Sequence, residues 1–250
     1  MNESADWWAT SIVRMEPGVV ELRGRPVQDL IGTVDFVSMI WLMVRGSMPT
    51  AGEAALLEAA LVASVDHGPQ APSIAIARMT ATCGVGLNNA MASGVNALGD
   101  VHGGAGQQCV EMLTEIVSLK DLDAAAAEVA GRYRYVPGFG HRFHPVDPRS
   151  EPLLSLVEQA VADGVVAGRH LAAARAVERF LARVPMNIDG ATAVIYAELG
   201  FAPELARGLF VLSRSVGILA HAWEEMGEGR RNKGPIPRSI LPTYRAESRR

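Results

Sequence analysis

The sequence predicts an all-α protein built from closely packed helices, and three observations support this fold class. Hydrophobic residues make up 49% of the 250 residues, and they recur mainly at the three- and four-residue spacing of amphipathic helices. Aromatic residues make up only 6%, whereas 25 residues are glycine and alanine is abundant. Because small side chains let helices approach closely, this composition favours helix packing over a sheet sandwich.

A single strand signal precedes the helices. Residues 19–27 (VVELRGRPV) alternate loosely around Gly24, which suits a small hairpin. An apolar block follows over residues 37–44. A helix is predicted from residue 51 to about 65, with Thr50 as its cap and Glu53 three residues after the cap. The stretch 73–98 is small and apolar, and its glycines at 84, 86 and 94 indicate close helix contacts or a break.

The rest of the chain alternates predicted helices with irregular segments. A glycine-rich loop covers residues 99–106, and a loop dense in proline, glycine, histidine and arginine covers residues 136–149. The tail from residue 227 is basic and irregular. Helices are predicted at about 107–119, 122–133, 152–162, 170–183, 187–200 and 203–226.

Charge and cysteine content bound the class of protein. The net charge of −4 argues against non-specific binding of nucleic acid. The two cysteines, Cys83 and Cys109, are too few for a disulfide framework. The chain starts with acidic residues where a signal peptide would be basic, and no apolar run reaches the roughly 18 residues of a spanning helix. The apolar stretch 209–219 is broken by Arg214. We therefore expect a soluble, cytoplasmic protein with no membrane or nucleic-acid partner.

Two histidines stand in unusual turns. His67, in Asp66-His67-Gly68, follows a predicted helix, where interaction with the helix dipole would explain it equally well. His102 lies in the glycine-rich loop, which is either a tight turn between helices or a place where a ligand approaches the backbone. A phosphate loop is not supported, because no Gly-Lys-Ser/Thr is present. Gly84-Val-Gly86 does not fit a dinucleotide-binding fold either, because no strand precedes it.

A third segment, residues 141–149, gathers two histidines, two arginines and an aspartate. His141, His144 and Asp147 are conceivable as metal ligands, but the neighbouring arginines repel a cation and no cysteine is near. Arginines beside histidines better suit carboxylates or phosphates. We therefore expect an anion-binding loop with no metal.

Two charged residues lie within apolar helical stretches. Arg214 must meet an anion if it is buried, either an internal carboxylate or a carboxylate of the substrate. Asp189 lies two residues after the expected cap Asn187, where a helix N-terminus stabilises a carboxylate. A structural role at the cap is the simpler reading of Asp189.

Taken together, these segments resemble the citrate synthase superfamily, including the citryl-CoA lyase module at the end of ATP-citrate lyase. The likeness spans residues from about 24 to 244. Seven motifs occur in the family's order: Gly-x-x-x-x-Asp-Leu near residue 30, Asp66-His67-Gly68, Gly99-Asp-Val-His102-Gly-Gly-Ala, Pro137-Gly-Phe-Gly-His141-Arg, Asp147-Pro-Arg149, Asn187-Ile-Asp189 and Ser213-Arg214-Ser-Val-Gly217.

The resemblance implies an almost wholly helical homodimer with its active site in a cleft between two domains. The large domain would comprise residues 1–106 and 206–250, and the small domain residues 107–205. Only about two helices separate the hairpin from Asp66, and this shortening is similar to the lyase module rather than to the longer synthases.

The resemblance also implies a role for each motif. His102 is similar to the histidine that donates to the thioester oxygen, Asp189 to the carboxylate that exchanges a proton with the acetyl methyl carbon, and His141 to the histidine at the oxaloacetate carbonyl. In cleavage, His141 would act as the base for the tertiary hydroxyl. The dicarboxylate would be bound by His67, Arg149 and Arg214. Coenzyme A would be bound by Val136, Pro137, Gly138, Phe139, Gly140 and Arg142.

The implied reaction is cleavage of citryl-CoA, or a related 3-hydroxy-acyl-CoA, to acetyl-CoA and oxaloacetate. It needs no tightly bound cofactor, because coenzyme A enters as part of the substrate. Two alternatives stay open: a condensing citrate or 2-methylcitrate synthase, and a non-catalytic subunit that binds CoA thioesters. The partners implied are an acyl-CoA, a 2-oxo acid and a second copy of the chain, and a separate citrate–CoA ligase is compatible with the lyase.

One departure from the family pattern concerns the substrate. The family carries Arg-Pro-Arg near the C-terminus, whereas this chain reads Ile236-Pro237-Arg238. The first arginine of that motif reaches a substrate carboxylate across the dimer. Either another cation (Arg230, Arg231, Lys233 or Arg238) replaces it, or the substrate carries fewer or differently placed carboxylates.

Overall fold

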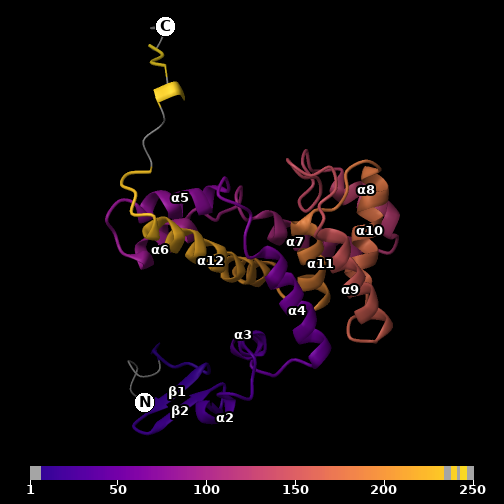
Figure 1. Cartoon of the computed structure of the whole chain (residues 1–250). Helices are drawn as coiled ribbons and strands as arrows, with labels where there is room; N and C mark the ends of the chain where they lie inside the picture. The colour runs from indigo at the N-terminus through magenta and orange to yellow at the C-terminus, as the bar shows by residue number, and fades with distance from the viewer. Residues whose placement is uncertain (1–6, 234–237, 241–242, 247–250) are drawn as a thin grey trace. The chain divides into compact units, whose positions relative to one another are not determined.

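The structure is a computed structural model that describes residues 7–233, 238–240 and 243–246 (Figure 1). It confirms the mainly helical fold. The chain divides into two compact units, unit 1 with residues 1–63 and 105–206, and unit 2 with residues 64–104 and 207–250. Residues 1–63 thus group with 105–206, whereas the resemblance assigns them to the large domain. The functional division into large and small domains stays a prediction.

Unit 1 begins with a three-stranded antiparallel sheet in the order β1 (Val13–Glu16), β2 (Val19–Leu22), β3 (Arg25–Pro26). The predicted hairpin is the β2–β3 pair. Its turn places Arg23 at φ 52° and Gly24 at φ 75°, as expected of a tight two-residue turn between twisted strands. Strand β1 was not predicted, since three of its four residues are exposed and give no alternating pattern.

Three helices follow the sheet: α2 (Val27–Leu30), α3 (Phe36–Arg45) and α4 (Ala51–Ser64), of which α3 and α4 have side-chain caps. Asp35 caps α3 by accepting from the backbone N–H of Ser38. The predicted cap of α4 is confirmed as a reciprocal pair. The Glu53 carboxylate accepts from Thr50 N at 2.7 Å, and Thr50 Oγ1 accepts from Glu53 N at 3.3 Å.

Five helices make the main body of unit 1: α7 (Ala105–Ser118), α8 (Leu122–Ala130), α9 (Ser150–Ala162), α10 (Arg169–Leu181) and α11 (Ile188–Glu198). Helix α11 contacts α7, α9 and α10 and forms the centre of this core. From Ile188 to Ala197 every residue except Asp189 is buried. The core therefore holds α11 rigidly and leaves one carboxylate at its start.

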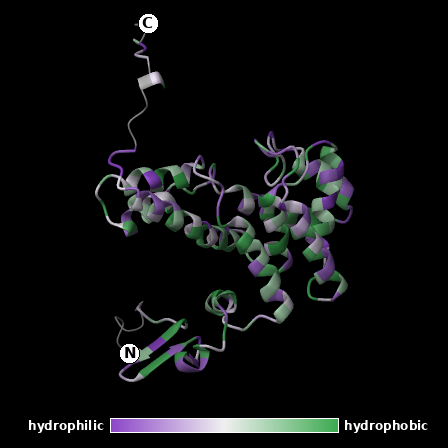
Figure 2. Cartoon of the chain, viewed as in Figure 1, coloured by the Kyte–Doolittle hydropathy of each residue, from purple (hydrophilic) through white to green (hydrophobic). Residues whose placement is uncertain are grey.

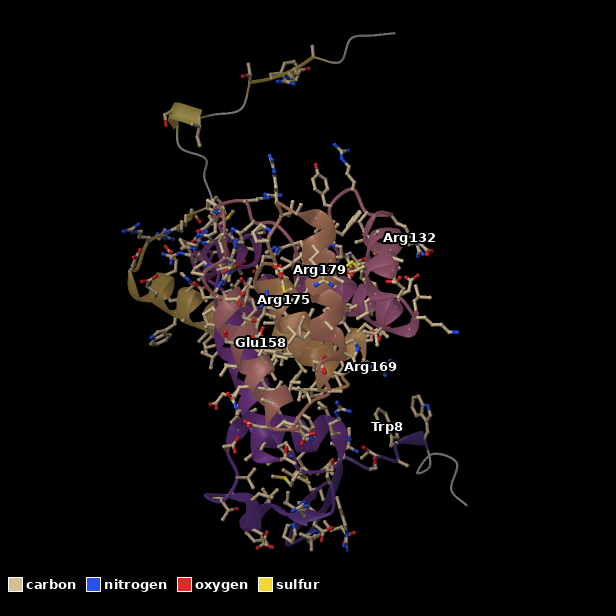
Figure 3. The ribbon with its side chains drawn as sticks, turned by 90° about the vertical axis from the view of Figure 1, so that its right-hand side faces the viewer. Trp8, Arg132, Glu158, Arg169, Arg175 and Arg179 are labelled. Atoms are coloured by element: carbon tan, nitrogen blue, oxygen red, sulfur yellow. The ribbon has the colours of Figure 1, made fainter. Side chains whose placement is uncertain are left out.

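Arginine–carboxylate pairs stabilise the outer helices of unit 1. Figure 3 labels three of these arginines: Arg175 and Arg179 on α10, and Arg132 after α8. Arg175 reaches Glu151 and Glu158 of α9 at 2.9 and 3.2 Å. These pairs are partly exposed, so each contributes little to stability.

Unit 2 contains α5 (Pro72–Ala81), α6 (Leu87–Asn96) and α12 (Pro203–Gly227) from residue 207 onward. The predicted break in the small-residue stretch is confirmed between α5 and α6. One buried cluster joins the three helices, with Ile74 and Ala77 from α5, Ala90 from α6, and Ile218 and Ala222 from α12. Residues 238–240 form one turn of 3-10 helix in the tail.

Helix α12 corrects one expectation. By length and composition it is apolar enough to cross a membrane, whereas no such run was predicted. Hydrophobic residues recur along it (Figure 2). However, Ile218 and Ala222 are fully buried against α5 and α6, and Arg214 is 6% exposed. One face of α12 therefore packs in the core of unit 2.

Candidate active site

His102 lies in the loop before α7, and its ring is held by the first turn of α5. Its Nε2 accepts from the backbone N–H of Ser73 at 3.1 Å and lies 3.0 Å from Ser73 Oγ. A neutral ring with Nε2 as acceptor carries its proton on Nδ1. Burial lowers the pKa of His102, and the positive charge of Arg214 lowers it further. His102 is therefore a neutral donor that presents Nδ1–H.

Arg214 and His67 lie in the same unit as His102. Arg214 is buried on α12, where Nε donates to the carbonyl oxygen of Ser64 at 3.1 Å. Its guanidinium carbon lies 4.9 Å from the centre of the Phe210 ring. His67 is half-buried in the turn between α4 and α5, as predicted. Unit 2 thus holds three of the predicted site residues.

The remaining predicted catalytic residues, His141 and Asp189, lie in unit 1 with Arg149 and the predicted CoA segment. His141 Nδ1 accepts from the backbone N–H groups of Phe143 and His144, both at 3.1 Å. The neutral ring therefore carries its proton on Nε2. Burial is the main cause that lowers the pKa of His141, with His144 and Arg149 lowering it further and Asp147 and Asp189 opposing the shift.

This tautomer refines the predicted role of His141. An Nε2–H group can donate to a carbonyl oxygen, as condensation requires. To accept the citryl hydroxyl proton, Nε2 must be unprotonated, so the ring's own proton must lie on Nδ1. An Nδ1–H group would then face the backbone N–H donors of Phe143 and His144. Cleavage with His141 as base therefore requires the 141–144 turn to rearrange.

Asp147 connects the anion-binding loop to the start of α11. Its carboxylate is fully buried and accepts from Nε and Nη2 of Arg149, both at 2.9 Å. The same carboxylate accepts from the backbone N–H of Ile188 at 3.0 Å. Burial alone would raise the pKa of Asp147, but Arg149 and the backbone donors outweigh it and lower the pKa to about 2. Asp147 thus holds Arg149 and α11 in a fixed relation.

The lowered pKa of Asp147 predicts an acid-dependent loss of stability. Its ordinary value is 3.8, so the folded state gains about 2 kcal/mol from this carboxylate above pH 4. The gain is lost as the pH falls through the folded pKa, and about half is lost by pH 3. Urea unfolding of the wild type and Asp147→Asn at pH 6 and pH 3 measures it. The stability difference between the two proteins should shrink by about 1 kcal/mol. An equal difference at both pH values would contradict the assignment.

Asn187 caps α11 and links it to the predicted CoA segment. Its Oδ1 accepts from Asp189 N at 2.9 Å and from Gly190 N at 3.2 Å. Its Nδ2 donates to the carbonyl oxygen of Gly140 at 2.6 Å, and Phe139 forms an isolated β-bridge with Met186. Residues 137–139 are buried and Arg142 is exposed. The cap that carries Asp189 and the 136–140 segment are therefore one connected structure.

The contact between this segment and α11 requires glycine at position 190. A Cβ there would lie 2.3 Å from the carbonyl oxygen of Gly138. We expect Gly190→Ala to lower the free energy of unfolding by about 1–3 kcal/mol, because backbone must move to admit the methyl group. Urea denaturation measures this loss. Gly227→Ala is the matched helical control, since nothing lies within 4 Å of its Cβ position. Equal stability of the two variants would contradict the close contact.

Sequence reasoning missed Ser73, which holds the His102 ring. It also missed Arg78, His221 and Glu225, which form a chain of contacts that ends at Asp66. The only available signal was helical spacing, since His221 lies seven residues after Arg214 on α12. Of the cations offered as replacements for the family arginine, Lys233 pairs with Glu225 at 2.8 Å and Arg230 with Glu228 at 3.0 Å. Ile236 lies outside the described residues. Within the described part of the chain, no group of three or more His, Cys, Asp or Glu could hold a metal ion.

Comparison with known proteins identifies the family. Residues 49–239 match the model of the citrate synthase C-terminal domain. The citrate synthase of Acidithiobacillus ferridurans is 28% identical over 214 residues, which cover 82% of this chain and 54% of that protein. The chain spans about half the length, or less, of the curated relatives that it matches.

Two solved structures are similar over almost the whole chain. Citryl-CoA lyase from Hydrogenobacter thermophilus has a TM-score of 0.86 and 30% identity, and the match covers 97% of this chain and 96% of that one. ATP citrate lyase from Methanothrix soehngenii, solved with citrate and coenzyme A, has a TM-score of 0.83 and 20% identity over 96% of this chain and 42% of that one. The chain belongs to the citrate synthase family.

Proposed function

We propose that this protein cleaves citryl-CoA, or a related 3-hydroxy-acyl-CoA, to acetyl-CoA and oxaloacetate. The observation that carries the proposal is the match to citryl-CoA lyase, which covers nearly all of both chains. The retained His102, His141 and Asp189 support chemistry on a CoA thioester rather than binding alone.

The bond changes assign a task to each residue. Once the 141–144 turn has rearranged, Nε2 of His141 takes the proton of the tertiary hydroxyl. The carbon–carbon bond then breaks, the hydroxyl carbon becomes the carbonyl of oxaloacetate, and the bonding electrons remain on the acetyl fragment as a thioester enolate. Nδ1–H of His102 donates to the enolate oxygen, because a donor already oriented costs no reorganisation during the reaction. Asp189 then delivers a proton to the methylene carbon, which completes the methyl group. Arg149 and Arg214 bind the carboxylates of oxaloacetate.

A condensing citrate synthase is the second candidate, because the curated relatives carry that name. The donor tautomer of His141 also fits the condensation direction, in which Nε2–H polarises the oxaloacetate carbonyl. The third candidate, a non-catalytic subunit that binds CoA thioesters, does not need all three catalytic side chains.

Product analysis separates these candidates. The pure protein is incubated with citryl-CoA, and acetyl-CoA, oxaloacetate, citrate and free CoA are followed by mass spectrometry. Acetyl-CoA with oxaloacetate is the expected result. Citrate with free CoA would favour the synthase, because its reaction ends in thioester hydrolysis. Binding without turnover would favour the non-catalytic subunit.

We further propose that the protein acts as a homodimer in the cytoplasm, with a separate citrate–CoA ligase supplying citryl-CoA. One apolar stripe supports the dimer. The stripe consists of five apolar residues of α12 that are between 37% and 66% exposed: Leu212, Val216, Leu219, Trp223 and Met226. Their spacing of four, three, four and three residues is that of a seam packing against another helix.

The dimer proposal predicts the effect of a charge in this stripe. Trp223→Glu should shift the protein to monomer, because a buried carboxylate without a partner is costly in an interface. Sedimentation equilibrium measures the change. Phe180→Glu on α10 is the control, since Phe180 is 45% exposed outside the stripe. A dimer that persists in Trp223→Glu would exclude this face as the interface.

A further inference from the structure

His221 connects α5 to the turn that carries His67. It lies on α12, two helical turns after Arg214, and its side chain is 18% exposed. Nδ1 lies 2.9 Å from Nη1 of Arg78 on α5. Because a guanidinium only donates, Nδ1 must accept, and the neutral ring then carries its proton on Nε2. Nε2 lies 3.3 Å from Oδ1 of Asp66.

Arg78 is itself held in place by carboxylates of α12. Its Nη1 donates to Glu224 at 2.6 Å, and its Nη2 lies 2.7 Å from Glu225. Glu225 is fully buried, and its second partner is Lys233 at 2.8 Å. Arg78 is only 12% exposed. This arrangement fixes the donor that faces His221 and therefore fixes the tautomer of the ring.

Asp66 shapes the turn on the other side of His221. Its Oδ2 accepts from the backbone N–H of Gly68 at 2.9 Å, which encloses His67 in the turn. Its Oδ1 is buried, and no described residue makes a well-aligned hydrogen bond to it. The backbone of α12 lies directly against this segment. Gly217 N donates to the carbonyl oxygen of Val65 at 3.1 Å, and a Cβ on Gly217 would lie 2.8 Å from Asp66 Oδ1.

Among the described residues, these contacts place the side chain of His221 beside Asp66 and give its ring one orientation. We propose that His221 is a positioning residue that fixes Asp66 and thereby presents His67 to the substrate dicarboxylate. The proposal rests on the proposed function, because a role for His67 in binding the dicarboxylate follows from the same resemblance. His221 itself need not touch the substrate.

The test compares H221L with H221Q. Leucine fills the space but removes both polar contacts. Glutamine keeps an acceptor for Arg78 and a donor for Asp66 on one amide, and it does not titrate. For H221L we expect KM for citryl-CoA to rise about tenfold, the scale of losing one polar contact to a carboxylate, with kcat within about threefold. H221Q should restore KM to within about threefold of the wild type.

A double-mutant cycle with Asp66→Asn tests whether His221 acts through Asp66. KM of the double variant should be no higher than that of the poorer single variant, because both changes remove the same contact between His221 and Asp66. Hydrogen exchange at the Gly68 amide is the structural readout, and it should be about tenfold faster in H221L, since the Asp66 acceptor is released.

Unchanged Gly68 exchange in H221L overturns the proposal, as does an unchanged KM in an active protein. Additive effects in the cycle, or an H221Q protein no better than H221L, overturn it as well. Inactivity of the wild type toward citryl-CoA contradicts the proposed function alone, and Gly68 exchange then decides the role of His221.

Discussion

Asp189→Asn is expected to lower kcat for citryl-CoA cleavage by about 10³-fold, because general acid–base transfer contributes on the order of 10²–10⁴. The new side chain cannot deliver a proton to the enolate carbon. It keeps the size of the original and the backbone hydrogen bond from Asp189 N to Asn187 Oδ1. Folding should therefore be unaffected, and steady-state kinetics with citryl-CoA measure the loss.

Two controls sharpen this prediction. The substitution places an asparagine directly before Gly190, a sequence that deamidates readily to isoaspartate and, in part, back to aspartate. Intact-mass analysis must therefore accompany each assay, with Asp189→Ala read in parallel. Asp163→Asn is the matched control, since Asp163 is exposed at the end of α9. Turnover of authentic Asp189→Asn within threefold of the wild type would remove Asp189 from the mechanism.

His102→Ala is expected to lower kcat by about 10²–10³-fold, the usual effect of removing one donor from an oxyanion site. Nδ1–H is the only donor of the neutral His102 ring. His102→Asn should retain more activity than His102→Ala, since its amide can place a donor near the Nδ1 position. The ratio of kcat for these two variants is the measurement, and equal activities would contradict the donor role.

The pH dependence gives a second test of His102. Because burial and Arg214 lower the pKa of His102, the ring is neutral at pH 7 and its donor form needs no titration there. In the pH profile of kcat, the loss of activity that protonation of His102 causes should occur below pH 6.5. His102→Asn should not show this loss. A limb above pH 7 that His102→Asn removes would show that the charged ring is the active form.

Local signals predicted much of the fold. The Thr50–Glu53 pair and the Asn187 cap are confirmed, because both depend on residues two or three positions apart. The strand β1 was missed, because its side chains are mostly exposed and carry no pattern. The membrane-spanning potential of α12 was also missed, because Arg214 was taken as a break in the apolar run.

The partners of the site residues could not be predicted from the sequence. Ser73 and His102 are 29 positions apart, and Asp147 and Ile188 are 41 apart. Only tertiary packing brings such pairs together. The tautomer of His102 depends on the distant Ser73 donor, and that of His141 depends on the conformation of the turn that brings Phe143 N and His144 N to its ring. The sequence therefore assigned both histidines a task without fixing which nitrogen performs it. His221 was passed over, because a histidine on a helix face is common.

Cleavage of citryl-CoA in D₂O tests the enolate intermediate most directly. A proton delivered to the methylene carbon comes from Asp189, which exchanges with solvent. We expect acetyl-CoA with one deuterium in its methyl group, formed together with oxaloacetate, and we expect Asp189→Ala to form almost none of this product. Acetyl-CoA without deuterium, or labelled acetyl-CoA formed at the wild-type rate by Asp189→Ala, would contradict it.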